Sequence, residues 1–457
     1  MFMDNNVPAL AALIGSVSAG EPEAQAVRLA FCGMNAVDIA EALEKAGRAE
    51  RIAAFRLLDE KTSADVFSYL LPETQESVVD GLTDTEVTEV MEVMSIDDMV
   101  DFIEDAPDEM AKRVLDSVST ERSQVADRLL DYPDDSAGSI MTTEVVELSK
   151  EMSVRDALGT IRSSGVDKET IYTCYVVEAD KSLVGVVTAD TLLYSEPGER
   201  IGNVMKTNFI YAEAGDDQEE LAAKFSKYDL LAMPVVSRAG GLVGIVTVDD
   251  ILRVMKEEDT EDFSKIAGVK PSEETYLKTG VFAHFKNRIL WLLVLMLAAT
   301  IAGIIIDAFE EPLQAVPILI AFVPMLMGAG GNAGAQASTI VIRGISLGDI
   351  GIGDLPKIVW KEARIAVVCS LILGAANFAR IYWMHGGRED AFTLSWVVSL
   401  SLCITFVISK TIGCALPLVA KKLKMDPAVM AAPLITTIVD CSALVVFFMI
   451  ASNSRLT

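Results

Sequence analysis

The segment PAVMAAPLITTIVDCSALVVFFMIA, residues 427–451, decides the class of this protein. It is apolar and long enough to cross a bilayer as a helix, which takes about 20 residues, yet it contains one acidic side chain, Asp440. Asp440 lies 13 residues beyond Pro427, and at about 1.5 Å per residue this places it near the middle of the membrane. Because burying a charge there costs about 2.5–3.5 kcal/mol, we expect Asp440 to face a bundle interior or water and to mark a cation pathway. A structural hydrogen bond is the alternative.

Four further segments have the length and hydropathy of membrane spans. They cover residues 289–306, 313–342, 365–382 and 392–419. The N-terminus lacks the basic region of a secretory signal, so we expect it to be cytoplasmic. Five spans then place the C-terminus outside, and the basic residues between spans fall mostly inside, as the positive-inside rule requires. Those on the inner side are Arg343, Lys357, Lys361, Arg364, Lys421, Lys422 and Lys424.

A second polar feature is the stretch PMLMGAGGNAGAQAST at residues 324–339. Glycines inside a span allow either close helix packing or an unwound stretch whose carbonyl oxygens line a cavity. Asn332 and Gln336 lie one turn apart within this stretch. Polar amides at this depth are unusual in a lipid-facing helix, so we expect them to contribute to the pathway.

The residues that precede Asp440 also carry oxygen atoms. Thr436 and Thr437 lie one turn N-terminal to Asp440, on a similar helix face. Pro433 is positioned to open the backbone next to them. The sequence therefore predicts a group of oxygen ligands around the intramembrane carboxylate.

The region before the spans is strongly acidic. The chain has a formal net charge of -28, and nearly all of the excess acidity lies before about Asp262. This argues against nucleic acid as a partner, because phosphate backbones are bound by clustered Lys and Arg. Two histidines, and six cysteines without a C-x-x-C pair, argue against a zinc or copper site. Hard ions with oxygen ligands fit better. We find no nucleophile–base pair or phosphate loop in the sequence and expect no catalysis.

The acidic region contains two kinds of structure. Residues 43–130 form short amphipathic segments that predict a compact all-helical domain. Beyond them the chain repeats itself, because LVGVVTADTLL at 183–193 returns as LVGIVTVDDIL at 242–252. Each copy predicts paired strands followed by a helix capped by Asp190 or Asp249. The repeat resembles a tandem pair of CBS modules, a family that senses adenine nucleotides or ions.

Motifs in the spans are similar to those of one transporter family. GGNAGAQAST at 330–339 with Arg343-Gly344, and Asp426-Pro427-Ala428 with Pro433, Thr437 and Asp440, resemble the membrane domain of the MgtE family of magnesium channels. The order of parts is similar as well, with an acidic helix-like stretch at 253–265 between the CBS pair and the spans.

The resemblance implies a multidomain membrane protein. Its parts would be an all-α cytosolic N-domain at 1–132, an α+β tandem CBS pair at 133–252, an acidic linking helix and linker at 253–286, and a five-helix α transmembrane pore domain at 287–457. It also implies a homodimer embedded in lipid, as a multi-pass protein of the inner cell membrane.

The resemblance further implies roles for single residues. Asp440 matches the pore carboxylate, Asn332 and Thr437 belong to the pore motifs, and Asp426 matches an acid at the inner mouth. Cytosolic regulatory carboxylates are matched by Asp97, Asp101, Asp217, Asp229, Asp249, Asp250, Glu258, Glu261 and Asp262. Tyr172 and Asp190 match positions that hold ATP in some members, although Ala189 and Leu230 depart from that pattern.

The expected function follows from these parts. The resemblance implies a Mg²⁺-selective, channel-like transporter for magnesium uptake, closed when cytosolic Mg²⁺ binds the acidic N-domain, CBS pair and linking helix. A divalent-cation transporter coupled to a Na⁺ or H⁺ gradient remains the alternative, because it could use the same intramembrane carboxylate. An enzyme regulated by its CBS modules is the more distant one.

Overall fold

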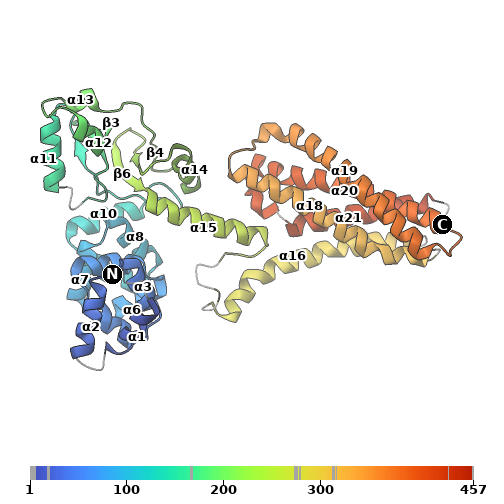
Figure 1. The fold of residues 1–457 in the computed structure, drawn as a ribbon, viewed down its shortest axis with the longest axis horizontal. Coiled ribbons are helices and arrows are strands. Elements are labelled where there is room, and N and C mark those ends of the chain that lie inside the picture. The colour runs from blue at the N-terminus through green and yellow to red at the C-terminus, as the bar shows by residue number, and fades with distance from the viewer. Residues whose placement is uncertain are drawn as a thin grey trace. The chain divides into compact units, whose positions relative to one another are not determined.

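The computed structural model describes residues 7–17, 21–164, 168–271, 276, 279–310, 314, 316–430 and 432–454. The chain divides into two compact units, Met1–Met255 and Lys256–Thr457 (Figure 1).

The first unit begins with a stack of short helices. Odd-numbered helices pack in one row from α1 to α9, and even-numbered helices pack in another from α4 to α10. Phe67 of the odd-numbered row packs against the even-numbered row. The centroid of its ring lies 6.3 Å from that of Phe55 and 5.2 Å from that of Phe102. The helices are α1 (Val7–Ile14), α2 (Glu21–Phe31), α3 (Ala36–Glu44), α4 (Arg48–Phe55), α5 (Glu60–Ser68), α6 (Pro72–Gly81), α7 (Asp84–Val93), α8 (Ile96–Asp105), α9 (Asp108–Ser117) and α10 (Thr120–Leu130).

The sequence repeat folds into two matching three-stranded sheets. In each sheet the short first strand is parallel to the second, which is antiparallel to the third. The two registers correspond, since Cys174 pairs with Val187 in one copy and Met233 with Val246 in the other. The strands are β1 (Glu147–Leu148), β2 (Thr173–Val177) and β3 (Leu183–Thr188), then β4 (Ala212–Glu213), β5 (Ala232–Val236) and β6 (Leu242–Thr247). The accompanying helices are α11 (Val154–Ser164), α12 (Ala189–Tyr194), α13 (Ile201–Val204) and α14 (Gln218–Tyr228).

Each repeat has a glycine at the same position, and it is required because another segment of the chain approaches it closely. A Cβ on Gly185 would lie 2.6 Å from the Met205 sulfur, and one on Gly244 would lie 2.6 Å from the Thr142 carbonyl oxygen. In each copy a neighbouring segment therefore passes directly over the third strand, which explains why both repeats carry the same LVG motif.

The helix that follows the second repeat is longer than predicted. It is α15 (Val248–Ile266), and it runs without a break through the predicted boundary between residues 252 and 253. The predicted caps are also displaced. Thr188 is the N-cap of α12, so Asp190 lies in its first turn, and Asp249 lies in the first turn of α15.

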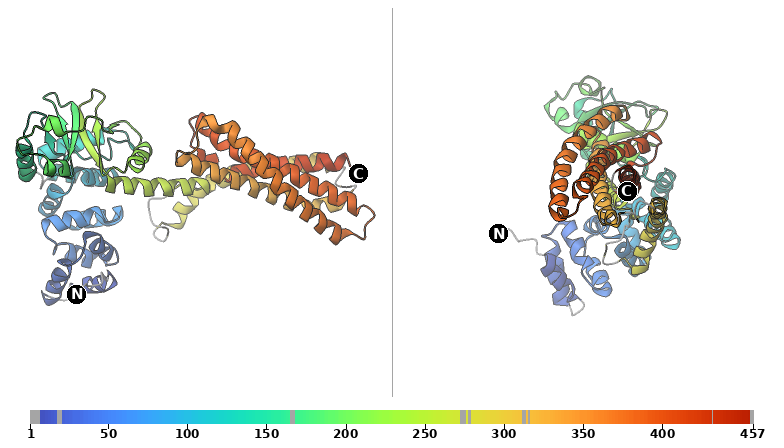
Figure 2. Two further views of the ribbon diagram at one scale, coloured as in Figure 1. Left: turned by 45° about the horizontal axis from the view of Figure 1, so that its top comes forward. Right: turned by 90° about the vertical axis from the view of Figure 1, so that its right-hand side faces the viewer.

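The second unit is a bundle of long helices. They are α16 (Val281–Ala308), η3 (Pro317–Phe322) with α18 (Val323–Ser346), η4 (Ile352–Asp354) with α19 (Leu355–His385), α20 (Ala391–Lys422), and η5 (Pro427–Met430) with α21 (Ala432–Ser452). Five of these stretches are long and apolar enough to cross a membrane. The helices extend beyond the apolar segments because their ends carry polar residues that leave the hydrocarbon region. Figure 2 shows α18–α21 running alongside one another.

The glycine-rich stretch forms part of an unbroken helix. Of the two alternatives that the sequence left open, close packing is therefore the outcome, and the unwound stretch is not. A Cβ on Gly330 would lie 2.8 Å from Thr405 of α20, and one on Gly334 would lie 2.9 Å from Ile435 of α21. The missing side chains let α18 pack tightly against both neighbours.

Candidate cation pathway and acidic cytosolic sites

Asp440 lies on α21 where this helix packs against α18. Its Oδ1 atom is shielded from solvent and has no hydrogen-bond partner among the residues that the structure describes. A Cβ on Gly331 of α18 would lie 3.6 Å from this oxygen. The glycine therefore gives the carboxylate room, and within the described chain no structural hydrogen bond is made to Oδ1.

The two threonines before Asp440 are held in fixed orientations. The hydroxyls of Thr436 and Thr437 donate to the carbonyl oxygen of Pro433 at 2.9 and 3.0 Å. A hydroxyl that donates its proton still has lone pairs with which to accept a bond or contact a cation. Pro433 was predicted to open the backbone, and it does not. It lies in the first turn of α21, where a missing N–H leaves no helical hydrogen bond unmade.

One face of α18 is polar and exposed on the single chain. Asn332, Gln336 and Thr339 are all exposed, whereas Ala333 and Gly334 between them are buried. Amide side chains in mid-span are unfavourable in lipid, so this face requires water or another protein surface. Asn332 directly follows Gly331, the residue that packs beside Asp440.

A group of charges lies at the start of η5 and involves the end of α15. The Asp426 carboxylate accepts a bond from the backbone N–H of Ala428 at 2.8 Å. Lys265 Nζ lies 2.6 Å from the other Asp426 oxygen and 2.8 Å from Glu261 Oε1. Burial, together with the charge of Asp426, raises the pKa of Asp262. Three predicted carboxylates thus meet around one lysine that was not predicted, while Glu258 lies half-buried one turn before Glu261.

A second acidic group lies in the first unit, between α8 and the start of α15. Asp97 is 5% exposed, and its Oδ1 has no hydrogen-bond partner within the described part of the chain. Burial, reinforced by the charge of Asp250, raises the pKa of Asp97 well above its usual value. Burial also raises the pKa of Asp101 to about 7 and that of Asp250. These predicted residues are therefore brought together.

Three members of this group, Asp98, Glu169 and Arg253, were not predicted. Burial and the charges of Asp250 and Asp249 raise the pKa of Glu169 to about 7. Arg253 forms ion pairs with Asp98 at 3.3 Å, Asp101 at 3.8 Å and also with Asp250. Nothing in the local sequence distinguishes Glu169 or Arg253 from other surface charges, because their proximity arises from tertiary packing.

The remaining predicted carboxylates have local roles. Asp217 is the N-cap of α14 and accepts from the backbone N–H of Glu219 at 2.9 Å. Asp229 ends the same helix in the left-handed conformation, with φ of 51°. They lie at opposite ends of α14, so they do not share one ion within a single chain. In the described residues, no three Asp, Glu, His or Cys side chains are placed to hold a metal ion together.

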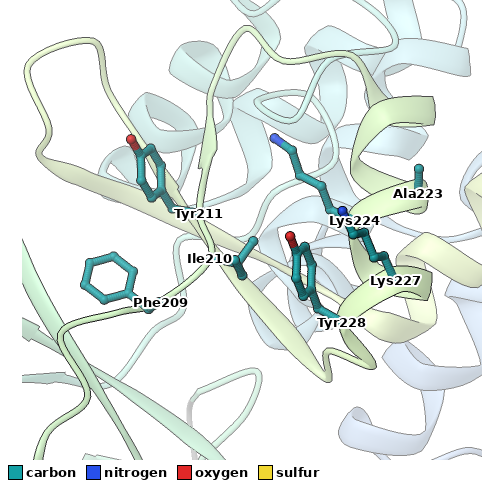
Figure 3. A pocket seen from close by; sticks show the side chains of 7 residues that line it. All are labelled: Phe209, Ile210, Tyr211, Ala223, Lys224, Lys227 and Tyr228. Carbon is teal, nitrogen blue, oxygen red and sulfur yellow. The ribbon is translucent and has the colours of Figure 1, made fainter. Parts of the chain in front are cut away.

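The two residues predicted to bind a nucleotide, Tyr172 and Asp190, are adjacent and exposed to solvent. The backbone N–H of Ala189 donates to the Tyr172 carbonyl at 2.9 Å, which brings Asp190 next to Tyr172. Tyr172 is 68% exposed. A separate surface pocket of about 440 Å³ lies in the second module and contains neither residue (Figure 3). Its lining is Phe209, Ile210, Tyr211, Ala223, Lys224, Lys227 and Tyr228.

Within the described residues of the bundle, a buried charged pair was not predicted from the sequence. Lys410 of α20 and Glu362 of α19 are both buried, and Nζ lies 3.4 Å from Oε2. Lys410 lies inside the predicted span 392–419, so a lone lysine in an apolar segment was a usable signal. Glu362 falls just outside the predicted span 365–382.

A bundle of membrane-spanning helices that holds a half-buried carboxylate with one unpartnered oxygen, joined to an acidic unit with paired CBS folds, is typical of a membrane protein for cation transport. Family models refine this class. Residues 323–450 match a divalent cation transporter model named MgtE, residues 34–135 match the MgtE intracellular N domain, and residues 137–197 and 201–257 match CBS domains.

Known relatives extend over most of the chain. It is 33% identical to the magnesium transporter MgtE of Thermus thermophilus over 88% of this chain and 89% of that protein. It is 34% identical to MgtE of Bacillus subtilis, with 88% and 87% covered. The chain therefore belongs to the MgtE family of magnesium transporters, and its predicted fold class is confirmed.

Solved structures resemble the cytosolic part. The cytosolic domain of the Mg²⁺ channel MgtE in complex with ATP is 30% identical, with a TM-score of 0.50, and the match covers 52% of this chain and 97% of that one. The soluble part of a magnesium transporter is 27% identical, with a TM-score of 0.52, and the match covers 55% and 99%.

Proposed function

We propose that this protein is a Mg²⁺-selective, channel-like uptake pathway in the inner cell membrane, with a cytoplasmic N-terminus and an external C-terminus. The observation that carries the proposal is Asp440, an intramembrane carboxylate with an oxygen that no described protein group satisfies. An ionised group left unpaired in a membrane interior is costly, and such groups usually mark an ion path. The positive-inside distribution of basic residues supports the orientation.

The pathway is proposed to form between two copies of the chain. The exposed polar face of α18 at Asn332 and Gln336 needs a partner other than lipid. No residue of α16 is buried within one chain, which leaves this helix free to contact lipid or a second copy. In a two-fold dimer with its axis along the pathway, two Asp440 carboxylates would oppose one divalent ion. Mg²⁺ sheds water reluctantly, so contact through its hydration shell is expected.

The dimer makes a simple crosslinking prediction. In a cysteine-free background, Gln336→Cys is expected to form a disulfide-linked dimer in the membrane on oxidation. Leu371→Cys, which is 65% exposed on α19, serves as the control and should remain monomeric. Equal crosslinking of the two variants would contradict the proposed interface.

Closure is proposed to follow cation binding at the two acidic groups. Carboxylates held close together repel one another, and a bridging divalent ion replaces that repulsion with attraction. High internal Mg²⁺ would therefore favour the closed state, because it binds that state better. If inhibition by internal Mg²⁺ survives neutralisation of Glu258, Glu261 and Asp262, the proposed role of α15 is wrong. ATP is a candidate additional ligand at Tyr172 and Asp190, suggested by the relative solved with ATP.

Flux in proteoliposomes tests the central proposal. Mg²⁺ uptake by the wild-type protein is expected without a proton or sodium gradient, and Asp440→Ala is expected to abolish it. Uptake that requires one of these gradients would instead support the gradient-coupled transporter. Unchanged uptake by Asp440→Ala would refute the pathway.

A further inference from the structure

Arg253 places a positive charge across the boundary between the helical domain and the CBS pair. Its guanidinium lies 3.3 Å from Asp98 and 3.8 Å from Asp101, both on α8. It also pairs with Asp250, one turn before it on α15. A single side chain thus connects carboxylates that are distant in the sequence and that belong to two different folds.

One guanidinium does not neutralise this group. The carboxylates of the group are Asp97, Asp98, Asp101, Glu169, Asp249 and Asp250. Asp97 is almost fully buried, and one of its oxygens has no partner in the described chain. Repulsion between the remaining carboxylates opposes packing of α8 against the CBS pair.

The position of Arg253 lets it bind the carboxylates and also lets a cation from solution displace it from them. Its side chain is 46% exposed, while the carboxylates of Asp98 and Asp250 are 22% and 11% exposed. Solvent therefore reaches the guanidinium, and a cation from solution can compete with it first for Asp101, which is 45% exposed and 3.8 Å away. A fully buried arginine would hold them permanently, whereas this one can share them.

We propose that Arg253 is a built-in counter-ion that holds the helical domain and the CBS pair together when divalent cations are scarce. It pairs with some of the carboxylates. Binding of Mg²⁺ therefore brings the two domains together by a smaller further step. The inference rests on the proposed function in one respect, because it assumes that Mg²⁺ binds this group. The holding role of Arg253 at low Mg²⁺ does not depend on that assumption.

Limited proteolysis of the full-length protein in detergent tests the proposal. With EDTA, cleavage between α10 and β1 is expected to be about 5-fold faster in Arg253→Gln than in the wild type, which corresponds to about 1 kcal/mol. With saturating Mg²⁺ the two proteins should be equally protected, which also shows that the variant folds. Arg200→Gln removes an exposed ion pair with Glu151 in the same unit and should behave like the wild type.

A charge exchange gives a second and sharper test. Asp98→Arg combined with Arg253→Asp moves the cation from α15 to α8 and should restore most of the protection lost in Arg253→Gln. Equal cleavage of wild type and Arg253→Gln in EDTA would overturn the inference while leaving regulation by Mg²⁺ intact. Faster cleavage of Arg253→Gln with no effect of Mg²⁺ on either protein would support Arg253 and refute the Mg²⁺ site.

Discussion

The bundle holds two acidic side chains in contrasting surroundings. Glu362 on α19 faces Lys410 on α20, and both are buried and paired. Asp440 on α21 faces a glycine, and one of its oxygens is unpaired. A buried acid with a counter-charge is already neutralised and fixes two helices, whereas one without a counter-charge is available to an ion. The contrast indicates that the missing partner, rather than the carboxylate itself, marks the pathway.

The largest expected effect comes from breaking the paired site. Glu362→Gln leaves the buried Lys410 without a counter-charge, and loss of one partner of a buried pair costs about 3–5 kcal/mol. We expect lower thermal stability in detergent, while Mg²⁺ flux per folded protein stays near the wild-type value. The double exchange Glu362→Lys with Lys410→Glu should recover much of the stability. Failure of the exchange, with stability no better than in Glu362→Gln, would count against direct pairing.

A smaller effect is expected at the glycine beside the unpaired site. In Gly331→Val the new side chain begins 3.0 Å from the Thr436 methyl group and 3.6 Å from Asp440 Oδ1. Overpacking of this kind typically costs about 1–3 kcal/mol, and it should displace Asp440 and reduce flux. Gly303→Val on α16 is the matched control, because a Cβ there meets nothing within 4 Å. Equal flux in the two variants would show that close packing of α18 does not position Asp440.

The weakest expected effect concerns pH in the cytosolic group. The pKa values of Asp101 and Glu169 are raised to about 7 in the folded protein, above their usual values of 3.8 and 4.5. The folded unit therefore holds protons that the unfolded chain releases, so its stability falls as pH rises from about 4 to about 7. In EDTA, Tm should be lower at pH 8 than at pH 6, by about 2–4 °C for each kcal/mol.

Mg²⁺ provides the control for this pH effect. Metal binding needs deprotonated carboxylates, so stabilisation by Mg²⁺ should be greater at pH 8 than at pH 6. A Tm that is independent of pH in EDTA, or Mg²⁺ stabilisation that is greater at pH 6, would show that Asp101 and Glu169 do not form the proposed group.

The sequence was informative where chemistry is local. Hydropathy located five spans, the repeat located two matching sheets, and Asp440 was visible as one acid in an apolar segment. The helix ends were less accessible, because the repeat and the acidic stretch join in the single helix α15. Pro433 was misread because its effect depends on whether it begins a helix or interrupts one.

Charge pairing could not be predicted from the sequence. Arg253 and Lys265 each pair with a carboxylate of their own helix, but their pairs with Asp101 and Asp426 join different elements, and Glu362 meets a lysine 48 residues away. Such contacts depend on how helices pack, which residue spacing does not specify. The same limit applies to Asp97, whose unpaired oxygen is evident only once the neighbours of α8 are known.

The most direct test compares the two acids of the bundle, Asp440 and Glu362, in one measurement. Mg²⁺ flux into proteoliposomes should be determined for Asp440→Asn and Glu362→Gln, each normalised to the amount of folded protein. The account predicts that Asp440→Asn loses nearly all flux with little change in stability, while Glu362→Gln keeps its flux and loses stability. Retained flux in Asp440→Asn would contradict the claim that the unpaired carboxylate forms the Mg²⁺ path.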